Sequence, residues 1–339
     1  MKLRAFCFIV SLLSVAIASA EPKSIKVFIL AGQSNMEGKA KMSLVEYQAQ
    51  QPATKELFAA WRKDEKWIER PDVWIKFWDR HGPLTVGYGS PNCIGPELAF
   101  GQVVGDHFDE QVLLLKTAWG GRSLYRDFRP PSAGLPPEDV LQTMLKKAQE
   151  KKPETTLEQI KEPFGASYRA MIAEVKAVTG DLSQHFPAAG EQKVELAGLV
   201  WFQGWNDMID GPATAEYAEN LVHFIQDIRR DLATPKLPVV VGQMGVDGLK
   251  ASDGVKRFKD AQARGAMAAE FAGNVVLVKT DVLWDQEADA VFRKGWKENL
   301  AEWNTVGSDF PYHYLGSAKC HLRMGKAFGE AMILLQKQP

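Results

Sequence analysis

Ser34 is the first residue in this sequence whose type and setting could do chemistry. It follows the apolar run from Val27 to Ala31 and a glycine, so the run predicts a buried parallel strand with Ser34 at its carboxyl end. Open α/β sheets bind their ligands at that end. Ser34 could be a nucleophile, although Gly-Ser is also an ordinary turn, and this stretch alone leaves both interpretations open.

Two further predicted strands end in polar turns that contain glycine. The strand 112–115 is followed by Gly120 and Gly121, and the strand 196–202 is followed by Asn206. The carboxyl ends of parallel strands lie along one edge of a sheet. A serine hydroxyl, a backbone N–H and a side-chain amide could therefore converge there on one carbonyl group, as acyl transfer requires.

The missing general base must be one of six histidines. Four of them fall in predicted helices or just before a strand, where a structural role is expected: His107, His185, His223 and His321. His313 is the best candidate, because it lies in the irregular stretch 307–316 close to Asp309, and a loop there can bring the imidazole over the sheet edge. His81, in a polar stretch of the first long connection, is the second candidate.

These residues lie in four stretches that resemble the SGNH (GDSL-like) hydrolases, within them the sialate O-acetylesterase and acetyl xylan esterase branch, carbohydrate esterase family six. The similar stretches are Gly32-Gln33-Ser34-Asn35-Met36, Gly120-Gly121-Arg122-Ser123, Gln203-Gly204-Trp205-Asn206-Asp207 and the surroundings of His313. The resemblance implies that Ser34 is the nucleophile and His313 the base. It also implies an oxyanion hole made by the N–H groups of Ser34 and Gly121 and the amide of Asn206.

The sequence departs from that branch at two positions. Trp205 stands where the branch usually has glutamate, although the wider superfamily pattern Gly-x-Asn-Asp is kept. The family's acid normally lies three residues before the histidine, where this sequence has Phe310, and Asp309 lies one residue further back. Asp309 is expected to reach His313 if the turn at Pro311 bends the chain, since proline keeps the preceding residue extended. Otherwise a Ser-His dyad or another carboxylate is expected.

The resemblance implies a serine esterase that removes O-acetyl groups from carbohydrate and needs no cofactor or metal. Neither a His-Glu-x-x-His motif nor a phosphate-binding loop occurs in the sequence. Five residues of the similar stretches or beside them are expected to contact the substrate: Gln33, Gln203, Trp119, Arg122 and Trp205. Two alternatives stay open, namely an SGNH esterase for lipid or small non-sugar esters, and a catalytically weak carbohydrate-binding protein on the same scaffold.

Alternating strand and helix patterns position these residues and predict a three-layer α/β/α sandwich with a mostly parallel sheet of about five strands. The expected strands are 27–31, 112–115, 196–202, 237–241 and 275–278, and the clearest helices are 97–107, 167–178, 214–232, 255–271 and 318–335. Residues 21–339 are predicted to form one domain. Two long insertions, near 39–95 and 124–195, interrupt it, and the charged segment 146–161 is expected to be a solvated helix face.

Residues 1–20 have the charged, apolar, small-residue order of a signal peptide, with cleavage expected between Ala20 and Glu21 and the product secreted or periplasmic. Losing Lys2 and Arg4 with this segment changes the formal net charge from −1 to −3, which favours neither nucleic acid nor an anionic membrane as a partner. Whether Cys93 and Cys320 pair, and what the oligomeric state is, stay open.

The sequence holds ten tryptophans, which is more than a bare scaffold needs. Aromatic faces in loops suit sugar rings, although packing in the core is the usual role of any one of them. Those expected in loops are Trp61, Trp67, Trp74, Trp78, Trp119 and Trp205.

Overall fold

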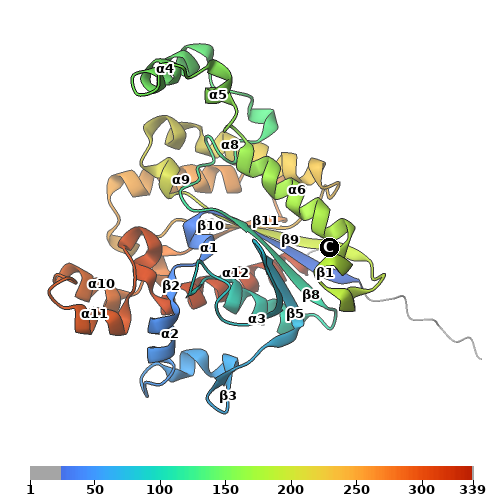
Figure 1. Cartoon of the computed structure of the whole chain (residues 1–339), viewed down its shortest axis with the longest axis vertical. Helices are drawn as coiled ribbons and strands as arrows, with labels where there is room; N and C mark the ends of the chain where they lie inside the picture. The colour runs from blue at the N-terminus through green and yellow to red at the C-terminus, as the bar shows by residue number, and fades with distance from the viewer. Residues whose placement is uncertain (1–23, 338–339) are drawn as a thin grey trace, which may run out of the picture.

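The computed structural model describes residues 24–337, and its centre is a twisted sheet of seven strands (Figure 1). The strand order is β11-β10-β9-β1-β8-β5-β6, and every neighbouring pair is parallel except β5 with β6. The bounds are β1 (Ile25–Gly32), β5 (Arg70–Phe77), β6 (Arg80–Leu84), β8 (Val112–Ala118), β9 (Val194–Phe202), β10 (Val239–Gln243) and β11 (Val275–Lys279). This confirms the predicted α/β class. The predicted signal peptide lies outside the described residues.

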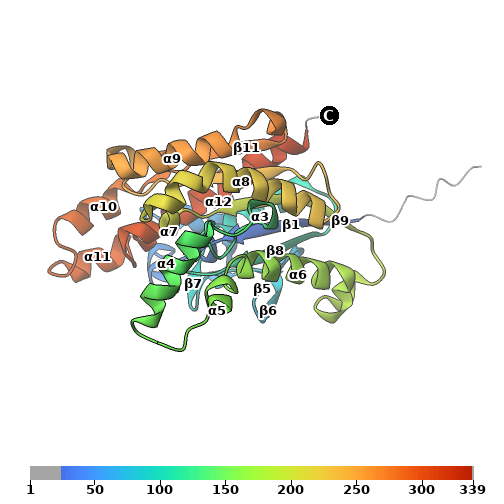
Figure 2. The ribbon, with the colours of Figure 1, turned by 90° about the horizontal axis from the view of Figure 1, so that it is seen from above.

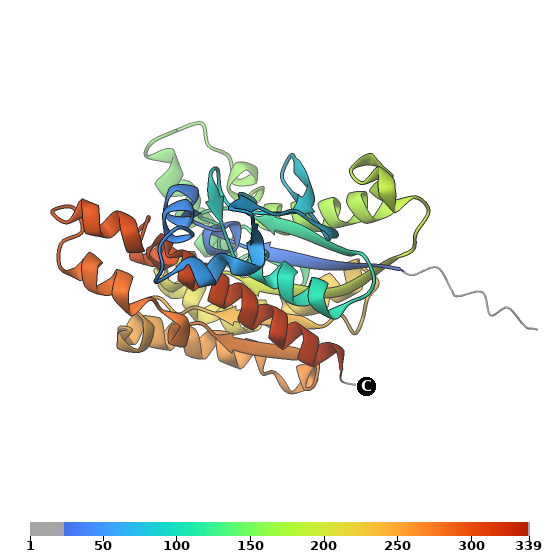
Figure 3. The same cartoon turned by 90° about the horizontal axis from the view of Figure 1, so that it is seen from below.

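Helices cover both faces of the sheet, as a three-layer sandwich requires. Seen from below, α3 (Glu97–His107) and α12 (Ala318–Gln336) lie side by side on one face (Figure 3). Seen from above, α6 (Ala166–Gly180), α8 (Gly211–Asp231) and α9 (Asp253–Ala266) lie over the other face (Figure 2).

The alternation of side chains along β9 shows how the layers are held together. Phe202 packs against Phe328 of α12 with ring centroids 5.2 Å apart, whereas its neighbour Trp201 packs against Phe224 of α8 at 4.3 Å. Successive residues of a strand point to opposite faces. Because both faces are covered by helices, the central strands β1 and β8 are buried along nearly their whole length and are mostly apolar.

The first long insertion is more ordered than the sequence pattern predicted. It contributes β5 and β6, which extend the sheet from the predicted five strands to seven. Trp74 lies in β5 and Trp61 at the end of a 3-10 helix; with exposures of 9% and 2%, both belong to the core. The expectation that these two tryptophans lie in loops was therefore wrong.

The remaining elements are short or lie at the surface. In the second insertion, α4 (Glu138–Gln149) buries only Leu141 and α5 (Leu157–Lys161) buries no residue, so the charged segment is a solvated helix face as predicted. The other elements are β2 (Ala40–Lys41), α2 (Met42–Gln48), β3 (Arg62–Lys63), β4 (Lys66–Trp67), β7 (Cys93–Ile94), α10 (Gln286–Arg293) and α11 (Leu300–Val306).

Cys93 and Cys320 are buried free thiols and do not pair. Each sulfur lies near a backbone carbonyl oxygen, that of Pro91 for Cys93 and that of Leu283 for Cys320. Among residues 24–337, no helix is both long and apolar enough to cross a membrane.

Candidate active site

Ser34 begins the short helix α1 (Ser34–Glu37) directly after β1, at the carboxyl edge of the sheet. The chain turns there by passing very close to β9. A Cβ atom on Gly32 would lie 2.1 Å from the carbonyl oxygen of Phe202, which also accepts a hydrogen bond from the Gln33 N–H. Only glycine permits this approach. The sharp turn holds Ser34 5% exposed, within reach of the loop before α12.

Ser34, His313 and Asp309 form one chain of hydrogen bonds. The Oγ of Ser34 lies 2.9 Å from Nε2 of His313, and Nδ1 of His313 lies 3.0 Å from Oδ2 of Asp309. The side chains of His313 and Asp309 are 17% and 23% exposed. Asn35 adds a second link, because its Nδ2 donates to the carbonyl oxygen of Tyr312 at 3.0 Å. These hydrogen bonds thus join the segment that follows β1 to the loop that precedes α12.

The loop before α12 places His313 through an unusual backbone. Phe310, which precedes a proline, is extended, whereas Tyr314 and Leu315 have φ angles of 51° and 62°. Such angles are rare outside glycine and persist only where the surroundings impose them. The anchor is the fully buried ring of Tyr314. Its hydroxyl accepts from the Gly245 N–H at 2.7 Å and lies 2.6 Å from the hydroxyl of Thr280.

The electrostatics of Asp309 favour its charged form. Burial raises its pKa, but the hydrogen bonds from His313 and from the backbone N–H of Phe310 lower it further, so the net pKa lies below the ordinary value. An ionised carboxylate at Nδ1 fixes the proton on that nitrogen and leaves Nε2 as the acceptor facing Ser34.

The three predicted oxyanion donors lie at the same edge of the sheet as the Ser34 hydroxyl group. The register of the sheet aligns Gly32 with Ala118 and with Phe202, so the loops after β8 and β9 reach the same edge as Ser34. Gly121, with φ of 71°, is exposed. In the described part of the chain, no protein acceptor faces its N–H, the N–H of Ser34 or the Nδ2 of Asn206.

Gln33 and Gln203, both expected to contact the substrate, are 2% and 3% exposed and bind other parts of the protein. The Oε1 of Gln33 accepts from Nε2 of Gln203 at 3.2 Å and from the Gly204 N–H at 3.0 Å. The Nε2 of Gln33 donates to Oδ1 of Asn206 at 3.3 Å, which directs the free Nδ2 of Asn206. These two amides orient the loops, whereas Trp119, Arg122 and Trp205 lie nearer the surface.

Asp207, which the sequence reasoning kept only as a reserve acid, is a fully buried link between two loops. Its carboxylate accepts from the backbone N–H groups of Leu124 and Tyr125 at 3.0 and 2.8 Å and from Nε2 of Gln203 at 2.5 Å. Burial raises the pKa of Asp207 to about 7, against the effect of these hydrogen bonds. Its position holds the loop that follows Gly121 against α7 (Trp205–Met208).

Glu37 was missed by the sequence reasoning and supports the same loop from the other side. Its Oε1 accepts from the Gly120 N–H at 2.5 Å, and its Oε2 accepts from Lys39 and Ser90. Burial raises its pKa, but these partners lower it below the ordinary value. The only sequence signal was its position two residues after Asn35, which does not distinguish a buried carboxylate from a solvated one.

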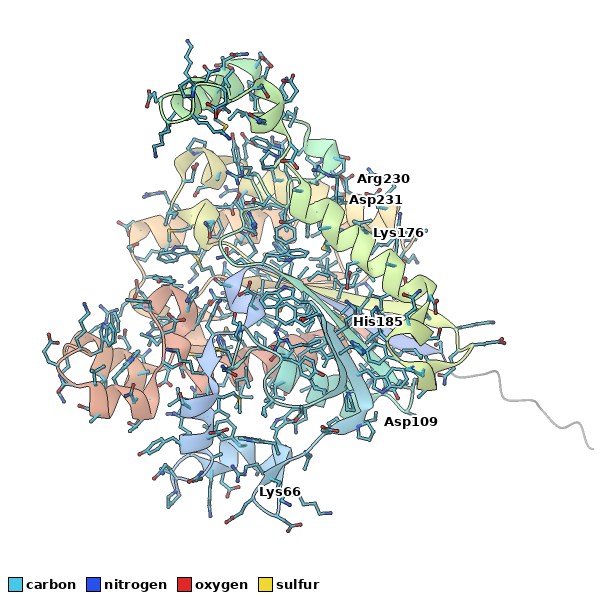
Figure 4. The ribbon with its side chains drawn as sticks, viewed as in Figure 1. Lys66, Asp109, Lys176, His185, Arg230 and Asp231 are labelled. Carbon is cyan, nitrogen blue, oxygen red and sulfur yellow. The ribbon has the colours of Figure 1, made fainter. Side chains whose placement is uncertain are left out.

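The competing histidine lies elsewhere. His81 is exposed on β6, and its ring packs against His185 with centroids 5.1 Å apart. Figure 4 labels His185 at the right of the view. In the same view, α10 and α11 lie at the left, as labelled in Figure 1. Across residues 24–337, no group of three or more His, Cys, Asp or Glu side chains could hold a metal ion.

Comparison with known proteins gives one family and several similar structures. The family described as "Carbohydrate esterase, sialic acid-specific acetylesterase" matches residues 24–295. The match includes Ser34, Gly121 and Asn206 and ends before Asp309 and His313. The comparison with curated proteins gives no match.

Among solved structures, a protein from Arabidopsis thaliana is similar with a TM-score of 0.51 and 15% identity, over 91% of this chain and 98% of that one. A carbohydrate acetylesterase from Xanthomonas citri gives 0.43 and 13%, over 75% of this chain and 49% of that one. The structure of NanS gives 0.44 and 14%, over 79% and 80%. At these identities, the Arabidopsis likeness supports the fold alone.

Replacing Tyr314 tests whether its anchor positions His313. Tyr314→Phe leaves the buried N–H of Gly245 without its acceptor, so the free energy of unfolding should fall by about 1–3 kcal/mol, measured in urea. The rate of ester hydrolysis should fall as well, because the adjacent His313 loses its support. Tyr168→Phe is the matched control, since it removes a tyrosine hydrogen bond to Asp231 away from the site. Equal activity in the two variants would contradict a positioning role for Tyr314.

Proposed function

Because this chain belongs to the carbohydrate esterase family described as sialic acid-specific acetylesterases, we propose that it removes O-acetyl groups from carbohydrate by a serine mechanism. The match confirms the family resemblance noted in the sequence. The observation that carries the proposed mechanism is the hydrogen-bonded chain from Ser34 through His313 to Asp309.

The proposed reaction has two acyl-transfer steps. His313 takes the proton of Ser34 at Nε2 while the serine oxygen attacks the acetyl carbonyl carbon, and the same proton then goes to the leaving sugar oxygen. Water, activated by His313, hydrolyses the acetyl-serine and releases acetate. Asp309 stabilises the imidazolium that forms in each step.

The negative charge of each tetrahedral intermediate falls on the former carbonyl oxygen. The N–H groups of Ser34 and Gly121 and the Nδ2 of Asn206 are proposed to receive it, and removing one such donor typically costs about 3 kcal/mol in the transition state. The buried contacts of Gln33, Asp207 and Glu37 support this proposal, since they hold Asn206 and the two sides of the loop that contains Gly121.

The proposal also covers where the enzyme acts and which class of substrate it uses. We infer an exported enzyme, secreted or periplasmic, from the signal-peptide pattern of residues 1–20. Acetate release from acetylated xylan, acetylated pectin fragments and O-acetyl sialic acid tests the carbohydrate class. Hydrolysis of p-nitrophenyl acetate without release from any carbohydrate would favour an esterase for small non-sugar esters. Inactivity on all four would favour a carbohydrate-binding protein.

Ser34→Ala should abolish acetate release and leave the fold intact, because it removes the nucleophile and no core contact. The measurements are steady-state acetate release and the thermal unfolding curve. A variant that kept about a tenth or more of the wild-type kcat would show that Ser34 is a turn residue and not the nucleophile.

His313→Ala should lower kcat at least ~100-fold, the low end of what a positioned base supplies. His81→Ala is the matched control and should have a far smaller effect, because His81 packs against His185 and not against Ser34. A larger loss of kcat in His81→Ala would transfer the role of the base to the first insertion.

Asp309→Asn should lower kcat by well over ~10-fold with little change in KM, because the acid acts on the imidazole and not on bound substrate. The pKa of Asp309 lies below its ordinary value, so the carboxylate is ionised at neutral pH and the substitution removes a charge there. An unchanged kcat beside an inactive His313→Ala would indicate a Ser-His dyad.

A further inference from the structure

A pocket of about 690 Å³ lies beside Asp309, between α2 and the pair α10–α11. The helices α10 and α11 project from the left side of the molecule in Figure 1. No step of the proposed mechanism uses this pocket. Its wall includes aromatic side chains together with small polar ones, among them Trp296, Trp303, Phe310, Ser43, Asn304 and Thr305.

A row of aromatic rings connects the pocket to the candidate active site. Trp205, next to Asn206, lies 5.5 Å from Tyr312 between ring centroids. Tyr312 stacks on Phe310 at 5.4 Å with an angle of 9° between the planes, and Phe310 meets Trp296 edge to face at 5.9 Å. The side chain of Phe310 is 45% exposed, and the other three are partly exposed. Solvent-accessible aromatic surface therefore runs from the oxyanion side of the site into the pocket.

The wall of the pocket is fixed before any ligand binds. Trp296 packs against Phe292 at 6.4 Å and against Trp303 at 5.9 Å, and Trp303 is only 4% exposed. Phe310 is held because its backbone carbonyl accepts from the N–H groups of His313 and Leu315. A preformed aromatic wall loses little conformational freedom on binding.

We propose that this pocket binds a sugar residue linked to the acetylated one, so that the substrate is an acetylated oligosaccharide or polysaccharide. The inference rests on the proposed carbohydrate esterase function. A pyranose ring offers an apolar C–H face to aromatic rings and hydroxyl groups at its edge to polar side chains such as Ser43, Asn304 and Thr305. The pocket lies next to the site, because Asp309 is part of its wall and contacts His313.

The family match ends at residue 295, so Trp296, Trp303 and Phe310 all lie beyond it. Of the residues proposed to act in the reaction, Ser34, Gly121 and Asn206 lie within it, whereas Asp309 and His313 lie beyond it. The nucleophile and oxyanion residues thus fall in the matched part, and most of the pocket's aromatic wall falls outside it.

The test compares two substrates in three variants. Trp296→Ala and Phe310→Ala each remove one ring from the pocket wall. Trp67→Ala is the matched control, since Trp67 is a partly buried tryptophan on the distant β3–β4 hairpin. Figure 4 labels the neighbouring Lys66 at the bottom of the view. The substrates are p-nitrophenyl acetate, which carries no linked sugar residue, and acetylated xylo-oligosaccharides.

The expected result is a change in the ratio of the two kcat/KM values. Trp296→Ala and Phe310→Ala should lower kcat/KM for the oligosaccharides about tenfold more than for p-nitrophenyl acetate, mainly through KM. Trp67→Ala should leave the ratio unchanged. Because each variant is its own reference, partial loss of folded enzyme cancels from the ratio.

Other results overturn the proposal. An unchanged ratio in both pocket variants means that the pocket does not bind the substrate, while acetate release from acetylated carbohydrate by the wild-type enzyme keeps the proposed function standing. Wild-type activity on p-nitrophenyl acetate alone, with no acetate from any acetylated sugar, removes both proposals together. Ser34→Ala, inactive on both substrates, shows in every case that the measured activity belongs to this site.

Discussion

The central position of β1, with parallel neighbours on both sides, is the constraint on which the site depends. β8 and β9 flank it, and their registers bring Ala118 and Phe202 level with Gly32. The three following loops must therefore leave the sheet at one edge. The loops that carry Ser34, Gly121 and Asn206 thus begin side by side, although 172 positions separate the first residue from the last. The approach at Gly32, too close for any Cβ atom, makes this arrangement intolerant of other residues there.

Buried polar groups convert that shared edge into a fixed geometry. Gln33 lies 2% exposed between Gln203 and Asn206, and Asp207 binds the N–H groups of Leu124 and Tyr125. A buried polar group left without a partner costs about 1–3 kcal/mol, so each of these loops has one low-energy arrangement. A hydrogen-bonded network of buried polar groups fixes the positions of its members more than it adds stability. Donors held in place need no rearrangement when charge develops on a substrate oxygen.

The sequence predicted those features of the fold and the candidate site that depend on local residue patterns. Apolar runs located five of the six parallel strands of the described sheet, and residue type with position at strand ends indicated Ser34, Gly121 and Asn206 as candidates. The sequence analysis missed the features that depend on contacts between residues far apart in the chain. Trp74 was expected in a loop because the charged residues of the first insertion hide the strand pattern of β5. The pairing of β5 with β8 makes this segment a strand of the sheet. The amides of Gln33 and Gln203 appeared available to a substrate, since nothing local shows that each is the other's partner.

The spacing of Asp309 and His313 shows why distance in sequence differs from distance in space. The loop closes on itself, because the carbonyl oxygen of Leu315 accepts from the N–H groups of Ser308 and Asp309. This closure requires Tyr314 and Leu315 in the left-handed region, with the buried Tyr314 hydroxyl bound to Gly245. Within a closed loop, the side chain that faces Nδ1 is set by backbone direction and not by the number of intervening residues. Phe310 is extended, and its half-exposed ring contacts Tyr312 and Trp296 in the aromatic row. The loop therefore brings the carboxylate four positions before His313 to Nδ1 and presents an aromatic surface beside it.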